Sequence, residues 1–203
     1  MVLSLSANRR VSIETSYGLI VVELYDATPK HQANFISLAE KGFYDSLIFH
    51  RVISNYMIQA GDPQSRPSLN SAAIGAGGTG YTIDSEINPK IIHKRGALAA
   101  ARFDDDVNPN QESSGSQFYL VQGRPYPRKY LEKFEKERGE KYTEDQLRAY
   151  ETIGGAPNLD GKYTVFGEIV IGLNIVEKIS EVETGRGNRP KQNIYILSMK
   201  VLK

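Results

Sequence analysis

The sequence predicts a mainly β protein, a closed antiparallel barrel with two core helices and one helical insertion. Three observations favour this fold class. Many short apolar stretches are rich in β-branched residues and are separated by turn signals. Only two segments outside one charged stretch show the spacing of core helices. Barrel closure would remove exposed strand edges, although the same pattern is also compatible with a sandwich.

The overall composition excludes several classes of site and partner. The chain has 203 residues, which suits one domain, and its 25 basic and 24 acidic residues give a net charge of +1. We therefore expect neither a nucleic acid nor an anionic membrane as a partner. Because the sequence contains no cysteine, thiol catalysis, cysteine zinc sites and disulfides are excluded.

We expect a flexible N-terminal segment over residues 1–9 and a single domain over residues 10–203. The start of the chain, MVLSLSANRR, has too short an apolar stretch for a signal peptide. No stretch approaches the roughly 18 apolar residues of a membrane span. These features predict a soluble protein, cytoplasmic or, if a leader has been removed, periplasmic, and they do not identify the compartment. We also expect a monomer.

The first elements are a hairpin and a helix. VSIET (11–15) and GLIVVELY (18–25) alternate as strands do, and the two residues between them suit a tight turn. A helix is predicted next, with Asp26 or Thr28 as its N-cap, Pro29 at its first position and Gly42 as its terminator.

The remaining apolar stretches predict further strands and a second core helix. GLNIVEKI (172–179) has Leu173, Val176 and Ile179 at roughly helical spacing. Strands are predicted at residues 47–53, 56–61, 96–102, 116–123, 163–172 and 194–202.

Residues 124–157 differ in character and predict a helical insert. Basic and acidic residues alternate here with scattered aromatic ones, Thr143 with Gln146 fits a capping box, and two glycines stop the second helix. Such alternation is typical of a solvated helical face. A weaker hypothesis gives the insert a partner-docking role through Tyr130, Phe134 and Tyr150.

Two glycine- or acid-rich motifs do not carry the chemistry that they superficially suggest. GAGGTG (75–80) has the letters of a dinucleotide site, but no helix is predicted after it, so we interpret it as a surface loop. DDDVNPNQESSG (104–115) starts like a calcium loop, yet Pro109 and Gly115 stand where glycine and glutamate are needed. A solvated turn is expected there.

The histidines and serines predict neither a metal site nor a hydrolase. His31, His50 and His93 lack the spacing of metal ligands, and each is interpreted as a hydrogen-bonded core residue. Ser116 lies in GSQF, which differs from the GxSxG motif of a nucleophilic serine.

FHRVISNYMIQAGDP (49–63) places Arg51 inside the most apolar run of the chain. This stretch resembles the signature of the cyclophilin peptidyl-prolyl cis-trans isomerases, which runs close to FHRVIxxFMIQGGD. SGSQFYL (114–120) and LDGKYTVFGEIVIGLNIVEKI (159–179) resemble the next two blocks of that family, in the same order. The resemblance covers about residues 10–202 apart from the insert, and similar inserts are found in some bacterial cyclophilins.

The resemblance implies an eight-stranded barrel capped by two helices, with the active site on its outer face. It implies a cofactor-free isomerase that accelerates rotation about X-Pro bonds in proline-containing peptides and in unfolded or folding proteins. By motif position, Arg51 is the catalytic arginine and Gln59 its hydrogen-bonding neighbour. The implied substrate-binding residues are Tyr56, Met57, Ala101, Arg102, Gln117, Tyr119, Leu159 and Tyr163, with Ala101 and Arg102 presenting backbone groups.

Four departures from the family pattern bear on this interpretation. Tyr56 and Tyr119 replace the usual phenylalanines, and each adds a hydroxyl that needs a partner or water. Tyr163 stands where many members have histidine, and Asn158 stands where tight cyclosporin binders have tryptophan, which argues against strong inhibition. The fourth departure is the insert itself. The alternative that these departures leave open is a proline-peptide binding module with little turnover.

Strand alternation predicts which side chains of this region meet. Arg51, Met57 and Gln59 would share one face of a regular strand, whereas Tyr56 would need a bulge or bend near Ser54–Asn55 to join them. On spacing alone, Arg51 could equally be a barrel-edge residue whose stem packs on its neighbours while its head reaches solvent.

Overall fold

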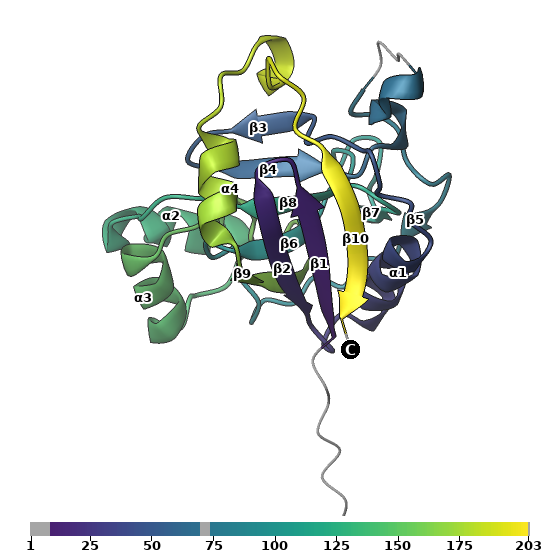
Figure 1. Ribbon diagram of the computed structural model, residues 1–203. Coiled ribbons are helices and arrows are strands. Elements are labelled where there is room, and N and C mark those ends of the chain that lie inside the picture. The colour runs from purple at the N-terminus through teal and green to yellow at the C-terminus, as the bar shows by residue number, and fades with distance from the viewer. Residues whose placement is uncertain (1–8, 70–73, 203) are drawn as a thin grey trace, which may run out of the picture.

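The computed structural model describes residues 9–69 and 74–202. Eight strands form one antiparallel sheet in the order β10-β1-β2-β9-β6-β8-β4-β3, and this sheet curls around a core (Figure 1). The predicted fold class is thereby confirmed. The predicted flexible segment, residues 1–9, lies outside the described residues except for Arg9.

The predicted elements recur, and most of the strands have shorter bounds than predicted. The strands are β1 (Arg10–Thr15), β2 (Gly18–Leu24), β3 (Arg51–Ile53), β4 (Met57–Ala60), β6 (Ala97–Ala100), β8 (Phe118–Val121), β9 (Val165–Ile171) and β10 (Ile196–Leu202), with β5 (Thr82–Ile83) and β7 (Ser113–Ser114) as a separate pair. The helices are α1 (Pro29–Glu40), α2 (Arg128–Arg138), α3 (Glu144–Thr152) and α4 (Leu173–Ser180), with 3-10 turns η1 (Pro63–Ser65), η2 (Pro67–Leu69), η3 (Pro157–Leu159) and η4 (Arg186–Asn188).

The barrel closes less regularly than predicted. β3 and β10 are the two ends of the sheet order, and no ladder joins them among the described strands. Instead, the segment before β3 meets the start of β10 through one bridge between Ile48 and Tyr195. The Phe49 N–H also donates to the Ile194 carbonyl at 2.9 Å. Irregular segments therefore complete the barrel between β3 and β10, and they satisfy backbone groups there without an eighth strand pairing.

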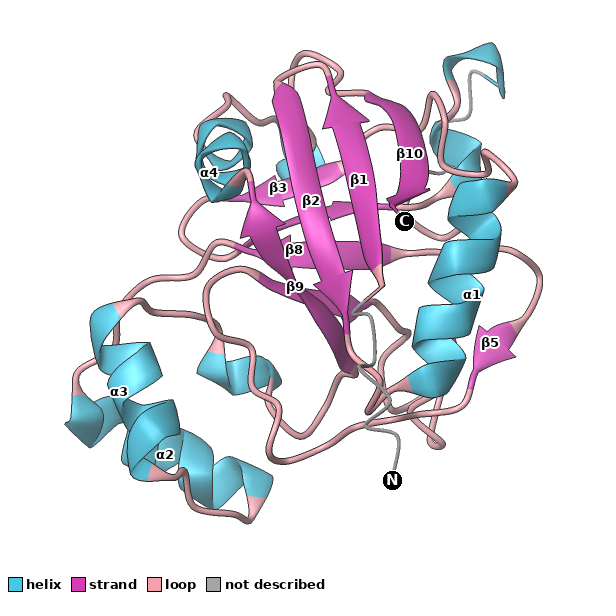
Figure 2. Cartoon of the chain, turned by 60° about the horizontal axis from the view of Figure 1, so that its bottom comes forward, coloured by secondary structure: helices cyan, strands magenta, loops and turns pink. Residues whose placement is uncertain are grey.

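Two helices cover the barrel as predicted. α1 starts at Pro29, whose missing N–H costs nothing at a helix N-terminus, and the chain leaves it through Gly42 at a positive φ of 63°. α1 packs beside β10, and α4 packs beside β2. Figures 1 and 2 show them at different sides of the sheet.

The two faces of the central strands build two separate apolar clusters. In β8, Phe118 and Leu120 point into the barrel core, whereas Tyr119 and Val121 belong to a second cluster outside it. β4 alternates in the same way, with Ile58 inside and Met57 outside. Both faces of these strands therefore carry apolar side chains. Those on the outer face can form one wall of a site.

The insert carries a small core of its own. Figure 2 shows α2 and α3 lying together on the side of the barrel away from α1. Thr143 and Gln146 form the predicted capping box at the start of α3. Tyr150 is fully buried within this insert core, so the hypothesis that it docks a partner is wrong. Tyr130 remains 54% exposed.

Candidate active site

The β3–β4 hairpin brings the two predicted catalytic residues together. Arg51 is paired directly with Gln59 across the two strands, and Ile53 is paired with Met57. Residues opposite each other in an antiparallel ladder point to the same face. The predicted common face is therefore correct, although cross-strand pairing rather than one continuous strand creates it.

A tight turn delivers Tyr56 to the same site. Asn55 lies in the turn at a φ of 59°, a left-handed conformation that asparagine tolerates better than most residues. The Tyr56 carbonyl accepts hydrogen bonds at 3.0 Å from the backbone N–H groups of Gln122 and Gly123. The bend predicted near Ser54–Asn55 is confirmed, and it turns the Tyr56 ring toward the cavity.

Nine of the ten predicted site residues line one cavity of about 230 Å³. The lining residues are Arg51, Tyr56, Met57, Gln59, Ala101, Arg102, Asp104, Tyr119, Leu159 and Tyr163. Asp104 was not predicted, and Gln117 is the predicted residue that lies outside this cavity. Gln117 instead lines an adjoining groove of about 470 Å³ that shares Gln59, Ala101 and Arg102 with the cavity.

Gln117 orients the predicted catalytic pair, Arg51 and Gln59, through a chain of amides. Its Nε2 donates to the carbonyls of Gly75 at 3.0 Å and Gly77 at 2.7 Å, so its Oε1 must face Gln59. Gln59 Nε2 donates to that oxygen at 2.9 Å, which leaves Gln59 Oε1 to accept from Arg51 at 3.3 Å. Each amide can be placed in only one orientation along this chain.

The glycine-rich loop is fastened to the site rather than loose on the surface. Asp62 is fully buried, and its carboxylate accepts from the N–H groups of Gly75 and Gly77 and, at 2.8 Å, from that of Gln64. A Cβ at Gly77 would clash with Asp62 Oδ1. Glycine is therefore needed here for close backbone approach to a carboxylate.

The cavity floor is apolar. Met57 and Tyr119 are 2% and 5% exposed and come from the outer faces of β4 and β8. Leu159, at the end of η3, packs against the same cluster, as does Tyr163. The Tyr163 ring meets the Tyr119 ring edge to face, with centroids 6.0 Å apart. These side chains form a hydrophobic wall opposite the Arg51 guanidinium.

Arg102 contributes more to the site than its backbone. Its side chain is 4% exposed and pairs with Asp105 at 2.7 Å, while its guanidinium lies 4.8 Å from the Tyr163 ring centroid. The Ala101 N–H and C=O are already bonded to Gln117 and Ser114. Among the hydrogen bonds of the described residues, none involves the backbone groups of Arg102, which leaves them for a ligand.

Both additional tyrosine hydroxyls have side-chain partners. Asn158 Nδ2 donates to the Tyr56 hydroxyl at 2.9 Å, and the Tyr119 hydroxyl lies 3.0 Å from His93 Nε2. Burial raises the pKa of the Tyr119 phenol well above its usual range, so this hydroxyl stays protonated. The sequence predicted that partners were needed but did not identify them.

The histidines differ from one another. His93 bonds to Asp160 and Tyr119, and His31 lies 2.6 Å from Glu86, as expected of hydrogen-bonded core residues. His50 is buried with neither ring nitrogen bonded to any described residue, so the interpretation of His50 as a satisfied residue is wrong. Burial lowers the pKa of His50 to about 4 and keeps its ring neutral.

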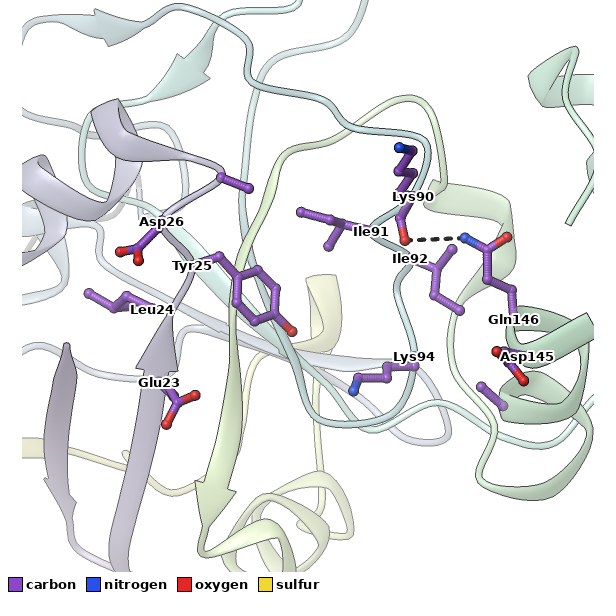
Figure 3. Close-up of a pocket in the computed structure, with 12 residues that line it drawn as sticks. Glu23, Leu24, Tyr25, Asp26, Lys90, Ile91, Ile92, Lys94, Asp145 and Gln146 are labelled. Atoms are coloured by element: carbon purple, nitrogen blue, oxygen red, sulfur yellow. Dashed lines mark hydrogen bonds between the residues drawn. The ribbon is translucent and has the colours of Figure 1, made fainter. Parts of the chain in front are cut away.

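A second cavity, of about 540 Å³, lies between the barrel and the insert. Figure 3 shows Tyr25, at the end of β2, projecting toward the loop that carries Ile91 and Lys94, with Gln146 of α3 beside that loop. Gln146 Nε2 donates to the Lys90 carbonyl at 3.2 Å. The lining carries charges of both signs and shares no residue with the site around Arg51.

Two kinds of feature are absent from the described part of the chain. It contains no group of three or more histidine, aspartate and glutamate side chains that could hold a metal ion. None of its helices is both long enough and apolar enough to cross a membrane.

Comparisons with known proteins agree with this geometry. Residues 10–201 match the family model for cyclophilin type peptidyl-prolyl cis-trans isomerase/CLD. The chain is 31% identical to an Aspergillus niger protein named peptidyl-prolyl cis-trans isomerase-like 1, over 95% of this chain and 94% of that one. It is 36% identical to a Streptococcus pyogenes protein whose name contains the words "bifunctional phosphatase/peptidyl-prolyl cis-trans isomerase", but it spans only 38% of that longer protein.

Solved structures show the same fold. The crystal structure of a Cryptosporidium parvum cyclophilin type peptidyl-prolyl cis-trans isomerase matches with a TM-score of 0.72 at 25% identity, covering 97% of this chain and 98% of that one. A second structure of that protein, determined in the presence of the dipeptide Ala-Pro, matches with a TM-score of 0.70 and covers 96% and 99% of the two chains. The motifs, the barrel and the family match together show that this chain belongs to the cyclophilin-type peptidyl-prolyl cis-trans isomerases.

Proposed function

We propose that this chain accelerates cis–trans rotation about X-Pro bonds in peptides and in unfolded or folding proteins. In this proposal Arg51 donates a hydrogen bond to the prolyl nitrogen as the bond twists. The observation that carries the proposal is one arginine, held by Gln59, lining a cavity of about 230 Å³ that also has an apolar wall. We also propose that the chain acts as a monomer.

The chemistry explains why an arginine suffices. A peptide bond resists rotation because the nitrogen lone pair is shared with the carbonyl, which creates a barrier of about 18–20 kcal/mol. Twisting ends that sharing, and the nitrogen becomes a hydrogen-bond acceptor that scarcely exists in the planar ground state. A donor placed there stabilises the transition state more than the substrate, which is the requirement for catalysis. No proton needs to leave either partner.

Arginine suits this position better than lysine would. Its guanidinium stays charged beside apolar groups and presents several donors in a rigid plane. One donor is used by Gln59 Oε1, which fixes the plane and leaves other N–H groups for the substrate. The Gln59, Gln117 and glycine-loop contacts hold that acceptor in place before substrate arrives, so little reorganisation is needed on binding.

The remaining residues suit a proline-containing substrate. Met57, Tyr119 and Leu159 form an apolar wall for the pyrrolidine ring. The free backbone groups of Arg102 can bond the adjoining peptide backbone. The groove bordered by the glycine-rich loop continues from this cavity, and it would take the residues on the other side of the rotating bond.

Exchange spectroscopy on a model X-Pro peptide tests the proposal directly. Arg51→Ala should lower kcat/KM by roughly 100-fold, because a single donor to the transition state is lost. Arg51→Lys should restore only part of the rate, since it keeps the charge but not the rigid fork. Arg148→Ala, which removes an exposed arginine of the insert, is the matched control and should retain the wild-type rate.

The same experiment separates catalysis from simple binding. Equal rates for wild type and Arg51→Ala would refute the proposal. Peptide-induced chemical-shift changes without accelerated exchange would favour the alternative, a proline-peptide binding module.

A further inference from the structure

A buried hydrogen-bond network joins the insert to the wall of the proline pocket. Asp160, whose side chain is 1% exposed, lies at its centre. Its Oδ1 accepts from the backbone N–H and from Nδ1 of His93, both at 2.8 Å. Its Oδ2 accepts from the hydroxyls of Tyr142 at 2.7 Å and Tyr150 at 2.5 Å. Both tyrosines belong to the insert, and His93 in turn reaches the Tyr119 hydroxyl.

The Asp160 carboxylate fixes the direction of the hydrogen bonds that it makes. An ionised aspartate can only accept, so His93 Nδ1 must carry the proton that lies between them. In the neutral form of this tautomer Nε2 is an acceptor, and it accepts a hydrogen bond from the Tyr119 hydroxyl, 3.0 Å away. Burial opposes the charge on Asp160, but the hydrogen bonds from His93 and Tyr150 outweigh it and lower the pKa of this carboxyl.

The insert supplies more than hydrogen bonds to this charge. The Arg138 side chain is 4% exposed, and its guanidinium nitrogen lies 3.8 Å from Asp160 Oδ2. The same guanidinium is 4.4 Å from the Tyr142 ring centroid. A buried carboxylate is costly unless it is paired and hydrogen-bonded, and the insert provides one opposite charge and two of the donors.

The His93 ring also packs on the site. It stacks almost parallel to the Tyr119 ring, with an interplanar angle of 11° and centroids 6.0 Å apart. Tyr119 is fixed at its backbone by β8, but rotation about its side-chain bonds would move the ring that faces the substrate. A hydrogen bond at the far end of this ring restricts that rotation.

We propose that His93 and Asp160 are positioning residues of the proline pocket, and that Tyr142 and Tyr150 of the insert hold them in place. They act through the Tyr119 hydroxyl, which sets the orientation of the pocket wall. The insert is thereby a structural part of the active site. This inference rests on the proposed function, because it takes the cavity beside Arg51 to be the proline site.

The test is whether the effect of His93 depends on the Tyr119 hydroxyl. His93→Phe keeps an aromatic ring but removes the acceptor, and it should raise KM for an X-Pro peptide roughly fivefold while kcat changes less than twofold. In the Tyr119→Phe background the same substitution should change KM less than twofold, because no hydroxyl remains to be positioned. An equal rise of KM in both backgrounds would overturn the proposal, since it would mean that His93 acts only as packing.

Substitutions within the insert test the second half of the proposal and do not depend on His93→Phe folding. Tyr142→Phe combined with Tyr150→Phe removes both donors to Asp160 Oδ2 and keeps the rings, and it should raise KM about twofold to threefold. It should also shift the ¹⁵N resonances of His93 Nδ1 and Nε2. Tyr130→Phe, which changes an exposed insert tyrosine, should alter neither. Wild-type KM and unshifted His93 resonances in the double variant would refute the role of the insert.

Peptide affinity distinguishes this inference from the proposed function. If the wild type binds the peptide without accelerating its exchange, the catalytic proposal fails. The Kd measured by NMR titration then replaces KM in the comparison of His93→Phe in the wild-type and Tyr119→Phe backgrounds. The role of His93 is therefore tested even if the catalytic proposal fails.

Discussion

Asn158 and Tyr56 are 102 positions apart in the sequence, yet the Asn158 amide donates to the Tyr56 hydroxyl at 2.9 Å. Asn158 lies in η3, where the chain leaves the insert, and Tyr56 lies in the β3–β4 turn. The bond therefore ties the end of the insert to one wall of the proposed proline pocket. Burial raises the pKa of Tyr56, while the Asn158 hydrogen bond acts in the opposite sense.

Asn158→Ala should weaken this wall. Removing the donor leaves a half-buried hydroxyl with less hydrogen bonding, which should cost about 1 kcal/mol in the free energy of unfolding and raise KM about threefold. Asn158→Asp is the matched control, because its carboxylate can accept from the Tyr56 hydroxyl instead. Urea unfolding and peptide turnover measure both effects. If both variants lose the same stability and affinity, the hydrogen bond is not the cause.

Gln117→Ala should reduce catalysis without changing the residues that line the cavity beside Arg51. Gln117 does not line that cavity but holds the Gln59 amide at 2.9 Å. Without it, Gln59 can rotate and Arg51 loses a fixed acceptor, so kcat should fall roughly tenfold while KM changes less. The Arg51 Nε–H resonance should also broaden or shift. A tenfold rise in KM with unchanged kcat would instead place Gln117 in direct substrate binding.

The glycine-rich loop offers a matched pair of alanine substitutions. A Cβ at Gly77 would clash with Asp62 Oδ1, whereas a Cβ at Gly78 would lie at an ordinary 3.6 Å from the Ser114 hydroxyl. Gly77→Ala must displace the carbonyl that holds Gln117, and kcat/KM should fall roughly tenfold. Gly78→Ala should stay within twofold of wild type. Equal activity of the two variants would show that the loop does not orient Gln117.

Local signals were sufficient to predict most of the barrel. The hairpin over Arg10–Leu24 and the helix Pro29–Glu40 follow from alternation, turn residues and a proline at the first helical position. The pair of two-residue strands, Thr82–Ile83 and Ser113–Ser114, could not be predicted. Such strands are too short for a periodic pattern, so only tertiary contact defines them.

The motif positions predicted the residues that line the cavity. They did not predict the side chains behind Tyr119 that hold it in place. His93 and Asp160 are 67 positions apart, and no sequence spacing links them. The insert illustrates the same limit, because alternating charges around Tyr142 and Tyr150 indicated a solvated face, whereas both rings are buried. An exposed pattern on one side of a helix does not show which polar tips on the other side bond to the barrel.

Stability should depend on pH through His50. Burial lowers its pKa to about 4 in the folded protein, against about 6.5 when unfolded. Between these values the unfolded chain binds more protons than the folded one, so the free energy of unfolding rises with pH. The contribution of His50 should therefore be complete above about pH 6.5 and should decrease by roughly 3 kcal/mol as pH falls toward 4.

His50→Phe isolates this contribution, because phenylalanine fills a similar buried space without titrating. Urea unfolding between pH 4 and 7 should give a clearly flatter stability profile for the variant than for wild type. The free energy of unfolding of the variant should still rise somewhat with pH. Burial also lowers the pKa of His31, and this shift makes stability rise with pH in the same way. At pH 7 the variant should be at least as stable as wild type, because it removes two buried ring nitrogens that have no partner among the described residues. If the stability of His50→Phe depended on pH as steeply as that of wild type, His50 would not be the source of the pH dependence.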